Sequence, residues 1–277
     1  MITPTAPAVE IAPGIKMPQV VFGTYQIGPA ETASAVRAAL EVGYRAIDTA
    51  AWYRNEAGVG QGVADSGLSR EQVFITSKHA KTDHGRDATL RGFEATMRRL
   101  KLDALDLYLI HWPLAPLGLY VETWAALLEL HDAGRIRSVG VSNFQVSHLE
   151  AIIAATGRTP AVNQIELHPG LAQPELRQFH AAHGITTECW APLGKGKILG
   201  SPPLVRAALS HQVSSAQVAL RWSVQRGQIV VPKSIHQDRM KQNLDVFSFS
   251  LSPEEMQAID RMGDSTRVGP HPDLVGL

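Results

Sequence analysis

Four polar side chains follow the ends of three short apolar runs in this chain. Asp48 and Tyr53 come after the first run, Lys78 after the second and His111 after the third. A tyrosine phenol has a pKa of about 10 and transfers protons poorly at neutral pH unless a neighbour tunes it. A lysine ammonium close by lowers that pKa, and an aspartate keeps the lysine charged. With a histidine that donates a hydrogen bond, these groups would protonate a carbonyl oxygen as it gains negative charge.

Each of the four residues has an ordinary explanation when it is taken alone. Asp48 would cap a helix, Tyr53 would pack against the core, Lys78 would be solvated, and His111 would be a satisfied core histidine. Four such residues at three successive strand ends are harder to explain in this way. We therefore expect an enzyme, and the reaction requires a hydride from another molecule.

Short apolar runs alternate with longer amphipathic runs along the chain. The predicted strand and helix pairs are 20–22 with 33–42, 44–47 with 56–65, 73–76 with 87–100, 107–110 with 121–133, 136–141 with 147–155, 162–165 with 174–183, 186–189 with 215–225, and 229–231 with 237–245. This alternation is typical of an α/β fold with parallel strands and outer helices. Eight units predict a (β/α)8 TIM barrel, since the rival doubly wound sheet usually has fewer strands. In such barrels the active site lies at the carboxyl ends of the strands, where the four residues stand.

The chain shows no linker or change in composition, so we predict residues 1–277 as a single domain. Residues 9–17 indicate a β-hairpin before the barrel. Ser252 and Pro253 begin an extra C-terminal helix, and a loop rich in glycine and proline follows it, free to fold over the mouth of the barrel. Ser147 is predicted to cap the fifth helix.

Composition excludes several classes of function. The 277 residues include 26 basic and 26 acidic side chains, so the net charge gives no reason to expect nucleic acid or an anionic membrane as partner. Cys189 is the only cysteine, which excludes an internal disulfide and a cysteine-based zinc site. No apolar stretch approaches the ~18 residues of a membrane span. We expect a cytoplasmic monomer without a metal, in which Cys189 is a small buried side chain.

Two glycine-rich segments do not fit nucleotide-binding loops. The glycines at 58, 60 and 62 break the G-x-G-x-x-G spacing and lie within a helical run. The segment 194–197 lacks the leading glycine and the hydroxyl residue of a P-loop.

A better cofactor site follows the eighth predicted strand. Lys233, Ser234 and Arg239 offer two cations and a hydroxyl. Barrels often bind phosphate with the loops after strands seven and eight and a helix N-terminus. These residues would suit the 2′-phosphate of NADP, although a solvated basic face remains the alternative.

Three motifs in the correct order give the chain a family resemblance. They are 43–50 with Glu56, 134–144, and 231–234 with Arg239, Gln242, Asn243 and Val246. The chain resembles the aldo-keto reductases from about Met17 to about His271. The resemblance implies an NADPH-dependent carbonyl reductase in which Tyr53 is the general acid, Lys78 and Asp48 tune it, and His111 orients the carbonyl.

The resemblance also implies cofactor contacts. Ser142, Asn143 and Gln164 would bind the nicotinamide carboxamide, and Trp190 would stack on the nicotinamide ring. Leu193 and Gly194 would contact the pyrophosphate. The residues that would bind the adenosine end are Lys233, Ser234, Arg239, Gln242 and Asn243. We expect NADPH, with NADH less favoured, because Lys233 and Arg239 remain although His236 replaces a residue that is often basic or hydroxylated.

Within the family the chain is most similar to short bacterial members such as the 2,5-diketo-gluconate reductases. Those relatives usually carry Leu-Trp after the lysine, where this chain has His79 and Ala80, which should open one wall of the pocket. Tyr25, Trp52 and Trp112 would form aromatic walls beside His111 around a small carbonyl substrate.

Two other functions stay open at this point. A barrel of this kind can bind nucleotide as a redox sensor or regulatory subunit with weak catalysis. An aldolase or epimerase could use Lys78 as a Schiff-base nucleophile.

Overall fold

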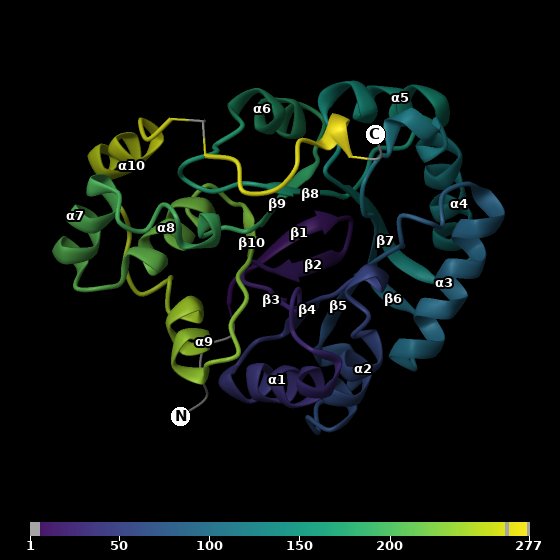
Figure 1. The fold of residues 1–277 in the computed structure, drawn as a ribbon, viewed down its shortest axis with the longest axis horizontal. Coiled ribbons are helices and arrows are strands. Elements are labelled where there is room, and N and C mark those ends of the chain that lie inside the picture. Colours follow the sequence, from purple (N-terminus) through teal and green to yellow (C-terminus); the bar gives the residue numbers. More distant parts are fainter. Residues whose placement is uncertain (1–5, 264–265, 276–277) are drawn as a thin grey trace.

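The centre of the protein is a closed barrel of eight parallel strands (Figure 1). The computed structural model describes residues 6–263 and 266–275. The barrel strands are β3 (Phe22–Gly23), β4 (Ala46–Asp48), β5 (Phe74–Lys78), β6 (Leu105–Ile110), β7 (Ile136–Ser142), β8 (Val162–Glu166), β9 (Thr186–Trp190) and β10 (Ile229–Val231). They pair in chain order, and a parallel bridge between Val20 and Val230 joins the first edge to the last. The predicted (β/α)8 barrel is confirmed.

Helices form the outer layer around this barrel. They are α1 (Pro29–Val42), α2 (Glu56–Ala64), α3 (Arg86–Leu100), α4 (Tyr120–Asp132), α5 (Val146–Thr156), α6 (Pro174–Ala182), α7 (Pro202–His211), α8 (Ser215–Val224), α9 (Gln237–Leu244) and α10 (Pro253–Asp260). As predicted, α10 is an additional helix, and Ser252 caps it by accepting the N–H of Glu255.

The strands are apolar because both of their faces are buried. In β6 every residue is buried. Leu107 and Leu109 belong to a cluster inside the barrel, whereas Tyr108 and Ile110 pack into the larger core under the helices. Successive side chains of a strand point to opposite faces, so one apolar run supplies both cores.

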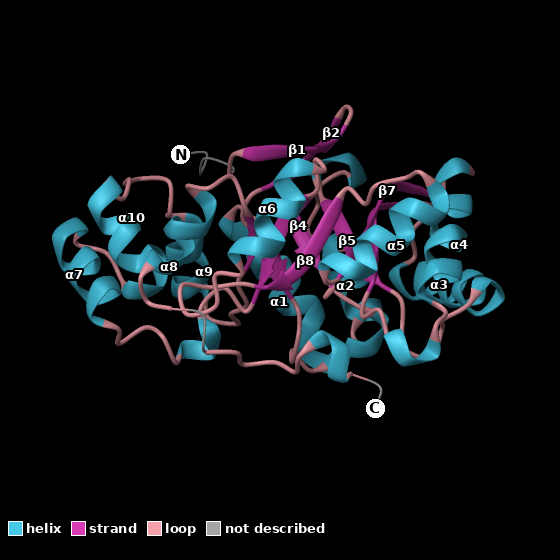
Figure 2. Ribbon diagram, turned by 90° about the horizontal axis from the view of Figure 1, so that it is seen from above, coloured by secondary structure: helices cyan, strands magenta, loops and turns pink. Residues whose placement is uncertain are grey.

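A hairpin closes the amino end of the barrel. Its strands β1 (Ala8–Ala12) and β2 (Ile15–Pro18) pair antiparallel around a turn in which Gly14 has a φ of +74°. Ile11 and Met17 pack into the cluster inside the barrel. The hairpin and the C-terminal tail lie at opposite ends of the barrel (Figure 2). The hairpin therefore leaves the carboxyl ends of the strands uncovered, and the C-terminal tail lies at that end.

The glycines of α2 serve helix packing, in agreement with their rejection as a nucleotide loop. A Cβ at Gly60 would collide with the carbonyl oxygen of Leu100, and one at Gly62 would lie 2.6 Å from the carbonyl oxygen of Ala33. Both positions allow α2 to approach its neighbours closely.

Two details differ from the sequence prediction. Helix α7 was not predicted, although Ser201 and Pro202 are typical of a helix start. It lies between β9 and α8. The predicted cap at Ser147 is wrong, because Gln145 is the N-cap of α5 and forms a capping box with His148. Gln145 and His148, and not Ser147, therefore cap the start of α5.

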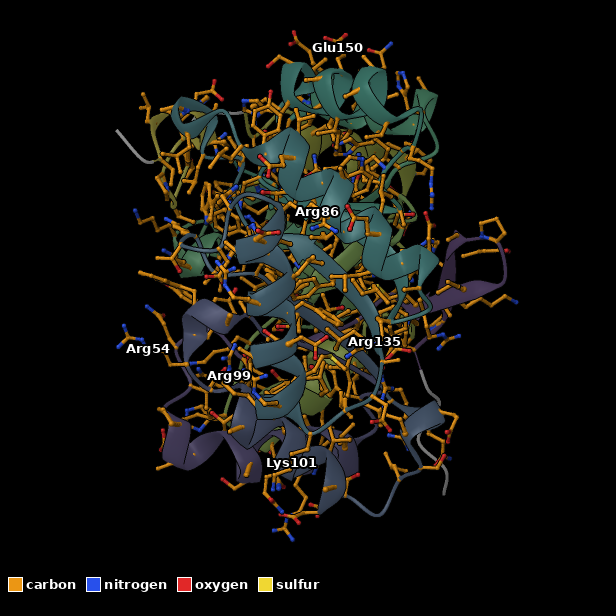
Figure 3. All side chains as sticks on the ribbon, turned by 90° about the vertical axis from the view of Figure 1, so that its right-hand side faces the viewer. Arg54, Arg86, Arg99, Lys101, Arg135 and Glu150 are labelled. Carbon is orange, nitrogen blue, oxygen red and sulfur yellow. The ribbon has the colours of Figure 1, made fainter. Side chains whose placement is uncertain are left out.

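The outer face of the helices is charged. Arg86 on α3 pairs with Glu129 on α4 at 2.7 Å, and Glu150 lies on the outside of α5 (Figure 3). Within residues 6–263 and 266–275, no helix is long and apolar enough to cross a membrane. Cys189 is buried, and burial raises the pKa of its thiol, consistent with a small apolar role.

Candidate active site

The four predicted catalytic residues meet at the carboxyl end of the barrel. Asp48 ends β4, Lys78 ends β5 and His111 directly follows β6. Tyr53 ends a short 3-10 turn that follows β4. Because neighbouring parallel strands end at the same edge, the four side chains converge although they are up to 63 positions apart in the sequence.

Lys78 is the centre of this group. Its side chain is fully buried, and its ammonium lies 2.6 Å from Asp48 Oδ1, 3.0 Å from the carbonyl oxygen of Thr49 and 3.4 Å from the Tyr53 hydroxyl. The Gln164 amide donates to Asp48 Oδ2 at 2.8 Å. Both carboxylate oxygens of Asp48 are thus bound, which fixes the ammonium beside the phenol.

Burial and charge set the protonation of this pair. Burial raises the pKa of Tyr53 to about 12, and Lys78 offsets this only in part. The expectation of a lowered tyrosine pKa was wrong, because the sequence does not show how strongly the hydroxyl is desolvated. Burial lowers the pKa of Lys78, but Asp48 and Tyr53 outweigh it and raise that pKa to about 12. At neutral pH the phenol is protonated and the lysine is charged.

His111 is a neutral imidazole beside the phenol. Its ring centre lies 5.7 Å from that of Tyr53. Burial, and then the charge of Lys78, hold the pKa of His111 well below its usual range. Its Nδ1 has no hydrogen-bond partner among the residues that the structure describes. A neutral imidazole can donate one N–H to a carbonyl oxygen without bringing a second charge.

The residues predicted to bind the nicotinamide form a hydrogen-bonded cluster next to His111. Asn143 adopts a φ of +64°, which asparagine tolerates, and its amide donates to the carbonyl oxygen of His111 at 2.9 Å and to Ser142 Oγ at 3.0 Å. The Trp190 indole donates to Asn143 Oδ1 at 2.8 Å, and Ser142 Oγ donates to the carbonyl oxygen of Gln164. The structure brings all four residues to the mouth of the barrel.

The residues predicted to bind the adenosine end lie after β10 and along α9. Lys233, Arg239 and Gln242 are exposed, whereas Ser234 and Asn243 are buried. No acidic side chain of the described part of the chain pairs with Lys233 or Arg239, so both cations are available for an anion. A phosphate monoester fits this donor set.

The pyrophosphate residues lie in a turn after β9. Leu193 is partly buried, and Gly194 has a φ of +54°. The N–H of Gly194 is already bonded to the carbonyl oxygen of Ala191 at 2.8 Å. A contact between this turn and a pyrophosphate stays a prediction.

Aromatic side chains surround the tetrad on the substrate side. Tyr25 and Trp52 are 46% and 50% exposed, and the Tyr25 ring lies 5.1 Å from that of Tyr53. Trp112 is 8% exposed and stacks against His111 at 6.4 Å. The three rings therefore lie where they could form the walls of a substrate pocket.

Sequence reasoning missed two ionisable groups at this site. Lys81 lies in the loop after β5 with its ammonium between the rings of Trp52 and Trp112. Glu188 lies fully buried in β9, next to Gln164 in register. An ionisable residue inside an apolar strand was the available signal for Glu188. Lys81 had no signal beyond its closeness to Lys78.

The C-terminal tail folds over the mouth, as predicted. The buried Glu166 accepts the N–H groups of Val268 at 2.6 Å and Gly269 at 2.9 Å. Gly269 lies so close to the Trp190 indole that a Cβ would collide with it. Val275 packs in an apolar cluster with Trp112. The tail therefore covers part of the cluster around Asn143.

Known proteins are similar to this chain along nearly its whole length. The profile of the Aldo/keto reductase family matches residues 19–264. An aldo-keto reductase of Mycobacterium sp. (strain JLS) is 49% identical over 267 residues, which covers 96% of this chain and 97% of the relative. A glyoxal reductase of Bacillus subtilis (strain 168) is 46% identical over 274 residues, with 99% of each chain covered.

Solved structures agree with the sequence comparison. A mutant of Gox0644 in complex with NADPH has 45% sequence identity and a TM-score of 0.95, and the match covers 99% of this chain and 100% of that one. Identity at this level over the whole barrel, together with the family profile, shows more than a shared fold. This chain belongs to the aldo/keto reductase family.

Proposed function

We propose that the protein catalyses the NADPH-dependent reduction of aldehydes and ketones to alcohols. The observation that carries this proposal is the buried ammonium of Lys78, held between the Asp48 carboxylate at 2.6 Å and the Tyr53 hydroxyl at 3.4 Å, next to a neutral His111. When bound, NADPH supplies the hydride that the carbonyl carbon accepts. The protein must then supply one proton to the carbonyl oxygen.

Tyr53 is the proton donor in this proposal. With its pKa at about 12 the phenol carries its proton throughout the neutral range. As the carbonyl oxygen becomes an alkoxide, the phenol O–H bond breaks and the new alcohol O–H bond forms. The phenolate that remains lies beside the Lys78 ammonium, which stabilises it without any movement of charged groups.

His111 positions the carbonyl. Because its imidazole is neutral at pH 7, one ring N–H donates to the carbonyl oxygen, and no proton is lost from the ring. The hydrogen bond from Asn143 to the His111 backbone holds this residue in place. Two donors, the phenol and the imidazole, would therefore meet the same oxygen.

The residues of the chain fit NADPH better than NADH. Lys233 and Arg239 are exposed cations without acidic partners in the described part of the chain, and they would bind the 2′-phosphate. Ser142, Asn143 and Gln164 would bind the carboxamide. A relative with 45% identity has been solved with NADPH bound, which supports this choice.

Tyr53→Phe tests the proposal, with Tyr25→Phe as the matched control. Loss of the phenolic proton should lower kcat for reactive aldehydes by about 10²–10⁴, while the Kd for NADPH stays within about twofold. Tyr25→Phe should keep most of its activity, because that hydroxyl takes no part in the proton transfer. Full activity of Tyr53→Phe would refute the assignment of the donor.

An NADPH-oxidation screen of wild-type protein separates the enzyme from the regulatory alternative. The panel would contain sugars, α-keto esters, aromatic aldehydes and bulky ketones. Nucleotide binding by fluorescence without reduction of any of them would favour a redox sensor. The single-domain organisation, the monomeric state and the cytoplasmic location stay predictions of the sequence.

A further inference from the structure

Lys81 is a cation at the mouth of the barrel without an anionic partner among the described residues. Its side chain is partly buried, and its ammonium lies 5.9 Å from the ring centre of Trp52 and 5.2 Å from that of Trp112. No carboxylate of the described residues lies within ion-pair distance of it. Lys78, three residues earlier, is by contrast fully paired with Asp48.

The surroundings of Lys81 do not neutralise it. Burial lowers its pKa, and no neighbouring acid in the described part of the chain counteracts this. The nearest acid in the loop, Asp83, accepts a hydrogen bond from Thr82. The other ionisable groups of the loop are His79 and His84, and burial lowers their pKa values to about 3 and about 4, so both are neutral.

The charge of Lys81 acts on the catalytic group. It helps to lower the pKa of His111, after burial and the larger effects of Lys78 and the neighbouring His79. The Trp112 ring centre lies 5.2 Å from this ammonium and 6.4 Å from the His111 ring centre, so the ammonium can act on a substrate held by that imidazole. The two indoles favour a cation between their faces, yet they leave its hydrogen-bond donors unused.

We propose that Lys81 selects carbonyl substrates that carry an anionic group, a carboxylate or a phosphate, and binds that group beside Trp52 and Trp112. This inference rests on the proposed function of the same site. Because the single ring of Trp112 separates the Lys81 ammonium from the His111 imidazole, the anionic group and the reacting carbonyl are separated by only a few bonds or by one aromatic ring.

Matched substrate pairs test this proposal. One pair is 4-carboxybenzaldehyde and 4-formylbenzamide, and the other is glyceraldehyde 3-phosphate and glyceraldehyde. The quantity measured is the ratio of kcat/KM for the anionic member to that for the neutral member. The pair with the larger ratio distinguishes a carboxylate from a phosphate.

Three variants accompany the wild type. Lys81→Met keeps the length of the side chain and removes the charge, so it should lower the ratio about tenfold, mainly through KM of the anionic substrate. Lys81→Arg should keep the ratio within about threefold of the wild-type value, because the positive charge remains. Lys16→Met removes an exposed lysine of the hairpin at the other end of the barrel and should leave the ratio unchanged.

The outcomes separate this inference from the proposed function. If wild-type protein reduces both members of each pair and Lys81→Met leaves the ratios unchanged, Lys81 only packs against the indoles and the inference is wrong. If Lys16→Met lowers the ratios as much as Lys81→Met does, the effect is one of net charge, which also refutes a specific site. If wild-type protein reduces carbonyls of the screening panel but no member of either pair, the inference is wrong, and if it reduces no carbonyl at all, the proposed function itself fails.

Discussion

Replacing Glu188 by Gln should change how the stability of the protein depends on pH. Glu188 is fully buried in β9, next to Gln164 of the neighbouring strand. Burial, and then the negative charge of Asp48, raise its pKa from 4.5 to about 8. At neutral pH the side chain is thus a carboxylic acid in the folded protein and a carboxylate in the unfolded chain.

The sign of the effect follows from the raised pKa. The folded state retains a proton that the unfolded chain releases above pH 4.5, so this contribution to stability is complete below pH 4.5 and is lost as pH rises through 8. At about 1.4 kcal/mol per pKa unit, the loss between pH 6.5 and pH 8 amounts to about 2 kcal/mol. The buried His79 and His84, with pKa values of about 3 and about 4, titrate below this window.

Urea unfolding at pH 6.5 and pH 8 measures this difference. Wild type should lose about 2 kcal/mol more than Glu188→Gln between the two pH values. Glu150→Gln is the control, because it removes a carboxylate from the exposed face of α5 (Figure 3) and should behave as wild type. Equal losses in wild type and Glu188→Gln would show that Glu188 is ionised when buried, which refutes the reasoning.

Three further predictions concern packing and the cofactor. Gly60→Ala should lower the free energy of unfolding by about 1–3 kcal/mol in urea, since its methyl group meets a backbone carbonyl, whereas Gly200→Ala, with open space around it, should stay within about 0.5 kcal/mol. Arg239→Met should raise the KM for NADPH on the order of tenfold and leave the KM for NADH within about twofold in steady-state assays; equal effects would place the 2′-phosphate elsewhere. Gly269→Ala should push the tail away from Trp190, so limited proteolysis of the tail should become faster and tryptophan fluorescence should change; unchanged cleavage would mean that the tail tolerates the methyl group.

The fold was predictable because a barrel strand buried on both faces is a continuous apolar run. The run at 229–231 coincides with β10. Helix α7 was missed because it interrupts the alternation of strands and helices, and the helix expected after β9 had already been assigned to α8. Its start at Ser201 and Pro202 was visible in the sequence, but the alternation leaves no place for a second helix there.

The tetrad was predictable because each member follows a strand and all strands end at one edge. The pKa values of its members were not predictable, since the desolvation of a side chain depends on neighbours that are distant in the sequence. Tyr53 illustrates this: the lysine beside it was expected to decide its pKa, and burial decides it instead. Lys81 was missed for the same reason, because its proposed role depends on contacts with Trp52 and Trp112, which belong to other loops.

The charge balance at the mouth links these observations. Lys78 and Lys81 bring two positive charges, Asp48 brings one negative charge, and Glu188 and His111 are neutral at pH 7. Among these five side chains one net positive charge remains, and it favours both an alkoxide in the transition state and an anionic group on the substrate.

This balance predicts that the preference for anionic substrates declines in alkaline solution. Between pH 7 and pH 9 Glu188 ionises, and the second carboxylate cancels the remaining positive charge. Loss of a proton from Lys81 would reduce the preference as well, so the comparison must isolate Glu188. In Glu188→Gln residue 188 cannot ionise, and the ratio of kcat/KM for 4-carboxybenzaldehyde and 4-formylbenzamide should fall less than in wild type. An equal fall in both proteins would assign the whole pH dependence to Lys81 and remove Glu188 from the charge balance.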